Sequence, residues 1–157
     1  MAPLPEIADV GTLEIALRLA SATGLGVLLG LDREVTGHSA GIRTHGIVAL
    51  SSATIMLTAL LLFAELRTTD AQPDPLRAIQ GLAQAIGFIA AGLIFVRAGD
   101  VRNLTTAANI WLSAAVGIAC GAGQWQVVTI AAVLGLTLLV ALRIAKRHIS
   151  WIEADDE

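Results

Sequence analysis

Long runs without a charged side chain are the feature that most restricts how this chain can fold. Residues 103–142 form one run of 40 residues, and shorter runs cover 44–64 and 78–96. A helix needs about 20 apolar residues to cross the hydrocarbon core of a bilayer. The longest run therefore has room for two spans, divided by the turn-forming segment Gly121-Ala122-Gly123-Gln124. With a further apolar run before Asp32, the sequence predicts an all-α polytopic membrane protein, a bundle of five transmembrane helices.

The five spans are expected at about 13–31, 45–65, 77–97, 104–121 and 125–145, in one domain of residues 1–152 followed by an acidic tail at 153–157. Basic residues gather near the span ends of one side, which favours the cytoplasm. That side would hold Arg33, Arg43, Arg97, Arg102, Arg143, Lys146 and Arg147, against Arg18, Arg67 and Arg77 on the other. This distribution predicts an N-terminus outside the cell and a cytoplasmic C-terminus.

Composition excludes several classes of function. The net charge of −3 and the lack of tyrosine argue against nucleic acid as a partner. The partner that the apolar runs do indicate is the lipid bilayer. A single cysteine, Cys120, excludes an intrachain disulfide and a multi-thiolate zinc site. The chain also lacks the common nucleotide-binding, zinc-protease and nucleophile-elbow motifs. We therefore expect no enzymatic activity.

Glycines at four-residue spacing indicate close helix packing. Gly26 and Gly30 form one GxxxG pair and Gly117 and Gly121 another. Small residues at this spacing let helix backbones approach closely in lipid. The pairs serve either the internal packing of the bundle or the interface of a homodimer, and the sequence favours a homo-oligomer without deciding which helix would form it.

The connection between the first two spans carries more polar groups than a turn requires. Asp32 and Glu34 are carboxylates of the kind that hold Mg²⁺ together with several waters. In the alternative interpretation they pair with Arg33 and Arg43 and anchor the helix ends. Mg²⁺ is the candidate ion here, and no other cofactor is indicated.

Polar stripes occur on two of the later spans. Gln80 and Gln84 share one face of the third span, which begins near Arg77. On the fourth span one face carries Thr105, Asn109, Ser113 and Cys120, with Thr106 beside them. Two such stripes could line a hydrated path, or they could hydrogen-bond one helix to the other.

Three blocks of sequence resemble one family, the MgtC/SapB membrane proteins. Gly26-Val-Leu-Leu-Gly-Leu-Asp-Arg-Glu34 with Ala40-Gly-Ile-Arg-Thr-His45 is similar to the family's first signature. Asp74-Pro-Leu-Arg77 with Ala85-Ile-Gly-Phe-Ile-Ala-Ala-Gly92 is similar to the second, and Val101-Arg-Asn-Leu-Thr-Thr-Ala-Ala-Asn-Ile-Trp111 to the third. The chain departs from the family pattern at Ala85, Ala90 and Asn103, where glycine is usual.

The resemblance implies a five-span protein of the bacterial inner membrane that is linked to magnesium. It implies a transporter of a divalent cation; the alternative is a non-transporting regulator that binds other membrane proteins, such as ATP synthase, when Mg²⁺ is scarce. Many members carry a soluble C-terminal domain, so the likeness covers only their transmembrane part. The signature positions implied to be functional are Asp32, Arg33, Glu34, Arg43, Thr44, His45, Arg77, Thr105 and Thr106, while Gln84 and Asn109 come from the polar stripes.

Overall fold

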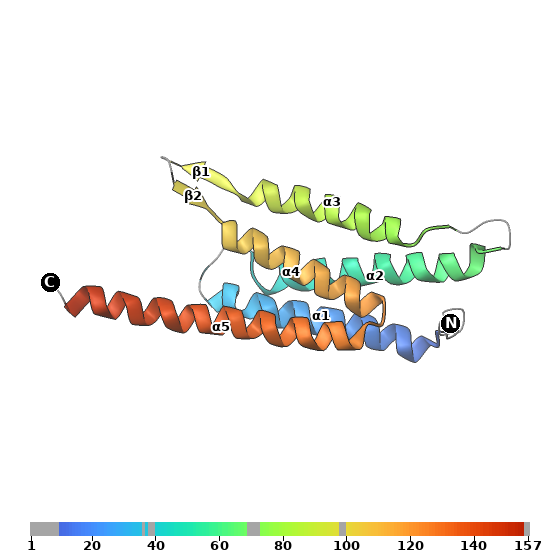
Figure 1. Cartoon of the computed structure of the whole chain (residues 1–157), viewed down its shortest axis with the longest axis horizontal. Helices are drawn as coiled ribbons and strands as arrows, with labels where there is room; N and C mark the ends of the chain where they lie inside the picture. The colour runs from blue at the N-terminus through green and yellow to red at the C-terminus, as the bar shows by residue number, and fades with distance from the viewer. Residues whose placement is uncertain (1–9, 36, 38–39, 69–72, 98–99, 156–157) are drawn as a thin grey trace.

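Five helices and one short hairpin make up the fold (Figure 1). The computed structural model describes residues 10–35, 37, 40–68, 73–97 and 100–155. The helices are α1 (Thr12–Val35), α2 (Ile42–Leu66), α3 (Leu76–Leu93), α4 (Leu104–Gly121) and α5 (Trp125–Asp155), and the hairpin is formed by β1 (Phe95–Arg97) and β2 (Asp100–Arg102). The predicted fold class, an all-α bundle of five helices, is confirmed.

Four of these helices, α1 to α4, are long and apolar enough to cross a membrane. At about 1.5 Å per residue, the 25 residues of α2 extend over more than the 30 Å of a hydrocarbon core. In α5 the apolar part of the described chain is Trp125–Ala141. The helix itself continues to Asp155, ten residues beyond the predicted end of the fifth span at 145.

The helices lie along one axis, and the chain passes from end to end of the bundle with each of them (Figure 1). Consequently α1 begins at the end of the bundle opposite the one where α5 ends. This matches an odd number of passes. Which end faces the cytoplasm stays a prediction from the distribution of basic residues.

The helices α1, α2 and α4 contact one another, and α2 meets both of the others at almost backbone contact. A Cβ atom built on Gly26 of α1 would lie 2.6 Å from the carbonyl oxygen of His45 and 2.8 Å from the Cβ of Ala49. One turn further along α1, a Cβ on Gly30 would lie 2.8 Å from the Cα of Ile42. Only glycine fits at either position, because the opposing atoms belong mostly to backbone.

The second glycine pair, on α4, packs against the same helix. A Cβ on Gly117 of α4 would lie 2.9 Å from the Cα of Ala49, and one on Gly121 would lie 2.9 Å from the Cα of Ala53. Ala49 is therefore covered by both Gly26 and Gly117. Both GxxxG pairs serve the internal packing of the bundle, and neither offers a face to a second copy.

The third helix is shorter than the predicted span of 77–97. It ends at Leu93 because Ile94 is extended, with ψ of 124°, and the chain then enters the hairpin. The hairpin is antiparallel, and Phe95 is paired with Arg102. Asn103 follows it in the left-handed conformation, with φ of 66°, and its Nδ2 donates a hydrogen bond of 3.0 Å to the carbonyl of Leu93. This bond joins the end of α3 to the beginning of α4.

Substituting the central glycines by alanine should destabilise the bundle. In Gly117→Ala the new Cβ meets the backbone of Ala49, which cannot move without displacing α2, and we expect a loss of about 1–3 kcal/mol. The matched control is Gly87→Ala in α3, where no atom lies within 4 Å of the new Cβ. Thermal unfolding in detergent micelles should show a lower midpoint for Gly117→Ala and an unchanged or higher midpoint for Gly87→Ala. Equal midpoints for the two variants would contradict the packing described here.

Candidate functional site

Buried polar side chains from three helices lie near the end of the bundle where α1 is connected to α2. They are Arg33 of α1, His45 of α2 and Thr106, Asn109 and Ser113 of α4, and none is more than 7% exposed. We name these five residues the polar cluster. Polar groups at such depth in a membrane protein are expensive and commonly mark functional positions.

The glycine contacts explain why these residues of three different helices lie close together. Gly26 and Gly117 both pack on Ala49, so the three helices are in register at that level. Toward the α1–α2 connection, Arg33 lies two turns beyond Gly26, His45 one turn before Ala49, and Ser113 one turn before Gly117. A hydrogen bond of 3.3 Å from Asn109 Nδ2 to the carbonyl of Leu29 fixes the same register between α1 and α4.

The hydrogen bonds of the cluster are incomplete. His45 Nδ1 lies 2.9 Å from the carbonyl oxygen of Gly41. Because a carbonyl only accepts, Nδ1 carries the hydrogen, and in the neutral ring Nε2 is an acceptor. Within the part of the chain that the structure describes, His45 Nε2, Thr106 Oγ1 and Ser113 Oγ are buried and have no hydrogen-bond partner. Two hydroxyls and one ring nitrogen thus retain the capacity to bind water or a small polar ligand.

Glu34, one of the two predicted metal ligands, has a structural role. Its side chain is exposed, and its Oε2 accepts a hydrogen bond of 3.1 Å from the backbone N–H of Ile42, at the first residue of α2. This carboxylate also packs closely on Gly41. It therefore satisfies one free N–H group in the first turn of α2, where a negative charge interacts favourably with the helix dipole.

Asp32 is partly buried in the last turn of α1 and does not belong to a ready-made metal site. Among the described residues no three His, Cys, Asp or Glu side chains are grouped so that they could hold a metal ion. Arg43 is exposed and Thr44 partly buried at the start of α2. Of the predicted residues around this connection, the structure places only Arg33 and His45 in the polar cluster.

The two polar stripes do not face each other as predicted. In α3 the buried residues are Leu82, Ile86 and Ala90, so that face contacts the bundle. Arg77, Gln80 and Gln84 are exposed on the outside of α3. In α4, Thr105 is exposed, whereas Thr106, Asn109 and Ser113 are buried. A hydrated path between α3 and α4 is therefore wrong for these residues, because only α4 directs its polar side chains inward.

Sequence reasoning missed the role of Arg18, which lies in the wall of a cavity at the other end of the bundle. Its Nε is 2.8 Å from Glu14 Oε1, and its Nη1 donates a hydrogen bond of 3.0 Å to the carbonyl of Gly121. Arg18 thereby caps the last turn of α4 from a helix distant in sequence. The spacing of Glu14 and Arg18, four residues apart on one helix, is the signal that would have pointed to the pair.

The chain is similar in sequence to known proteins of one family. The model of the MgtC family matches residues 19–148. The Escherichia coli (strain K12) protein named "Putative magnesium transporter YhiD" is 35% identical over 129 residues, which are 82% of this chain and 60% of that protein. The Brucella abortus (strain 2308) "Protein MgtC" is 38% identical over 80% of this chain and 50% of its own length. The Salmonella choleraesuis (strain SC-B67) "Protein MgtC" is 33% identical over 90% of this chain and 58% of its own.

The chain thus spans between half and three fifths of the length of these curated relatives. No solved structure matches it significantly.

Removing the two hydroxyls of the polar cluster that have no partner in the described chain should not lower the stability of the fold, whereas removing the bonded amide of Asn109 should. Thr106→Val and Ser113→Ala delete buried polar atoms without a partner among the described residues, so the free energy of unfolding should be unchanged or higher. Asn109→Ala removes the bond to Leu29 and should lower it by about 0.6–2 kcal/mol. Thermal unfolding of the three variants in one detergent measures the difference. If Thr106→Val were as destabilising as Asn109→Ala, the hydroxyl would have a structural partner after all.

Proposed function

The chain belongs to the MgtC family, and from this premise we propose that it is a non-enzymatic, multi-pass protein of the bacterial inner membrane with a magnesium-linked regulatory role. In this proposal it acts by lateral association of α3 with a helix of another membrane protein or of a second copy. The observation that carries the proposal is the exposed polar face of α3. The regulator interpretation is thereby preferred to the transporter interpretation.

Two glutamines on the outside of a membrane span require a polar or protein partner. Gln80 and Gln84 are exposed in α3, a helix apolar enough to cross the bilayer. Gln84 lies at the middle of α3, where its amide group has no bonding partner in hydrocarbon, and leaving such a group unpaired costs several kcal/mol. Gln80 lies about one turn nearer the headgroups. Phe88 lies one turn beyond Gln84 and is 84% exposed. A Cβ on Gly81 or Gly92 of the same helix would meet no atom within 4 Å, so a second helix has room to approach.

A second copy of the chain could supply the hydrogen-bond partner that this face of α3 needs. A glutamine amide is both donor and acceptor, so Gln84 of one copy can pair with Gln84 of another across a two-fold axis. The predicted homodimer therefore has its most favourable interface on α3. A helix of another membrane protein with a polar side chain at the same depth would serve equally.

Packing in the interior also favours association over transport. Between the polar cluster and the opposite end, Gly26, Ala49 and Gly117 bring three helix backbones close together. Transport would require these contacts to open.

Divalent-cation transport is the second candidate, and two observations favour it. One relative is named "Putative magnesium transporter YhiD". In this chain Asp32 and Glu34 place two carboxylates in the last turn of α1, where an ion arriving from water would first meet the protein. Mg²⁺ is often held by one or two carboxylates and retained water, so the small number of ligands is compatible with a loosely bound ion.

Photo-crosslinking tests the association. A photoreactive side chain at Phe88, in native membranes, should give adducts with protein. Gln84→Leu should reduce their yield roughly threefold to thirtyfold, because one interhelical hydrogen bond of about 0.6–2 kcal/mol is lost. Gln126→Leu, an exposed glutamine at the start of α5, is the matched control and should leave the yield unchanged. An adduct of twice the chain mass identifies a homodimer and another protein mass a regulated partner, whereas lipid adducts alone would contradict the proposal.

Flux measurements test the second candidate. Liposomes containing the purified protein and a Mg²⁺-sensitive dye inside should show no more influx than protein-free liposomes, for the natural chain and for Asp32→Asn alike. Glu65→Gln, an exposed carboxylate near the end of α2, is the control for loss of one negative charge. Influx that requires Asp32 but not Glu65 would overturn the regulatory proposal and establish transport with an entrance in the last turn of α1.

A further inference from the structure

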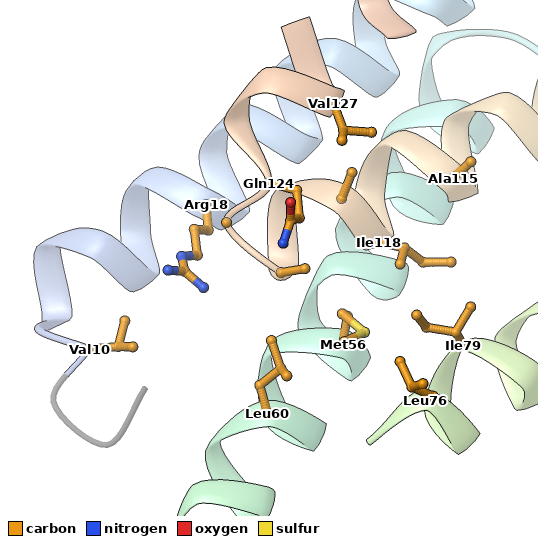
Figure 2. Close-up of a pocket in the computed structure, with 13 residues that line it drawn as sticks. Val10, Arg18, Met56, Leu60, Leu76, Ile79, Ala115, Ile118, Gln124 and Val127 are labelled. Carbon is orange, nitrogen blue, oxygen red and sulfur yellow. The ribbon is translucent and has the colours of Figure 1, made fainter. Parts of the chain in front are cut away.

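A cavity of about 640 Å³ lies at the end of the bundle remote from the polar cluster (Figure 2). Met56 and Leu60 of α2, Leu76 and Ile79 of α3 and Ile118 of α4 turn apolar side chains toward it. The volume is within the range of about 300–1,000 Å³ that small-molecule sites occupy. Its walls are mostly apolar, so an apolar chain is the chemistry that most of the interior accepts.

The position of the cavity along the helices is that of the boundary between acyl chains and headgroups. Arg18 is six residues from the beginning of α1, and Leu60 is six residues from the end of α2. Six residues correspond to about 9 Å of helix, and a 25-residue helix exceeds the hydrocarbon thickness by a few ångströms at each end. The mouth of the cavity therefore lies just inside this boundary, where an arginine can reach the headgroup level.

Arg18 places a cation with spare hydrogen-bond donors beside the apolar walls. Its Nε bonds Glu14 and its Nη1 bonds the carbonyl of Gly121. A guanidinium has five N–H donors, and among the described residues no acceptor bonds Nη2. Nη2 lies against Gly123, where a Cβ would be only 2.6 Å away and where φ of +70° also favours glycine. Gln124 adds a second polar side chain at this side of the cavity (Figure 2).

We propose that this cavity binds one anionic phospholipid, with an acyl chain between α2, α3 and α4 and the phosphate at Arg18. A phospholipid combines the two chemistries that the cavity presents, an apolar chain and a negatively charged oxygen group at fixed separation. The charge-assisted hydrogen bond from Nη2 holds the phosphate, and an anionic headgroup lacks the choline cation that the guanidinium would repel. In the first turn of α5, beside Gly123, the N–H groups of Trp125 and Val128 donate to the carbonyls of Gly123 and Gln124. The N–H groups of Gln126 and Val127 have no acceptor within the helix, and the positive end of the helix dipole reinforces the preference for an anion.

The lipid would also fasten the third helix to the bundle. α3 is attached chiefly along its contact with α4 through Leu82, Ile86 and Ala90. In its first part, Leu76 and Ile79 line the cavity together with Met56 and Leu60 of α2. An acyl chain at this place gives both helices a common apolar contact, so binding should raise the stability of the fold.

Lipid retention and thermal stability test the proposal in the full chain. Protein purified in detergent is supplied with palmitoyl-oleoyl-phosphatidylglycerol or with the phosphatidylcholine of the same chains, followed by native mass spectrometry and thermal unfolding. One phosphatidylglycerol per chain should be retained and should raise the unfolding midpoint, while phosphatidylcholine should bind about tenfold more weakly. Arg18→Gln should abolish the difference between the two lipids.

Because Arg18 also caps α4, a second variant leaves that contact intact. Ile79→Trp fills the cavity from α3 and should eliminate retention of phosphatidylglycerol, whereas Leu62→Trp, on the exposed side of α2, should not. Equal retention of the two lipids by the natural chain, or retention that survives Ile79→Trp, overturns the proposal. Retention that begins only after residues 1–9 are removed overturns it as well, because the occupant would then be a segment of the chain itself.

Discussion

The structure depends on the near-contact of three backbones around α2. Gly26 and Gly30 of α1 approach α2 closely, and so do Gly117 and Gly121 of α4. In lipid no hydrophobic force draws helices together, so close packing of small residues supplies much of the attraction. The same contacts set the rotation and the register of the three helices, and they thereby decide which side chains of each helix are turned inward.

The polar cluster is a consequence of that register. His45 is separated by one turn from the alanine that both glycine pairs contact, and Ser113 by one turn from Gly117. Had α4 been displaced by a single residue along α2, the buried positions of Thr106 and Asn109 would have rotated by about 100° toward lipid. The incomplete hydrogen bonds of Thr106 and Ser113 are therefore held in the interior by packing elsewhere. This is the arrangement expected when polar groups are retained for a ligand or for water and add nothing to stability.

Much of the fold follows from the sequence because a membrane permits few solutions. Spans must be apolar and helical, so uncharged runs such as 103–142 determine the number of helices. The end of α3 could not be predicted in this way, since Ile94, Phe95 and Val96 are apolar enough to extend a span and it is the hairpin that interrupts the helix.

The stripe on α3 was misjudged for a different reason. Periodicity shows that Gln80 and Gln84 share a face, but it does not show whether that face meets the bundle, and polar residues in a span were expected to lie inside. Thr105 and Thr106 illustrate the same difficulty, because adjacent residues on a helix differ in burial only once the neighbouring helices are placed.

The two surfaces of α3 connect the proposed association with the proposed lipid. The outer face carries Gln84 and Phe88, and the inner side of its first turn carries Ile79 against the cavity. A lipid that fastens the first turn to α2 also fixes the direction in which the outer face points, so the two binding events share one helix and need not share a single residue. By reciprocity, a partner that binds the outer face best in that orientation must strengthen lipid binding by the same factor. The helices α1, α2 and α4 supply the other walls of the cavity, but their glycine contacts leave them one arrangement. α3 is consequently the element through which lipid and partner act on each other.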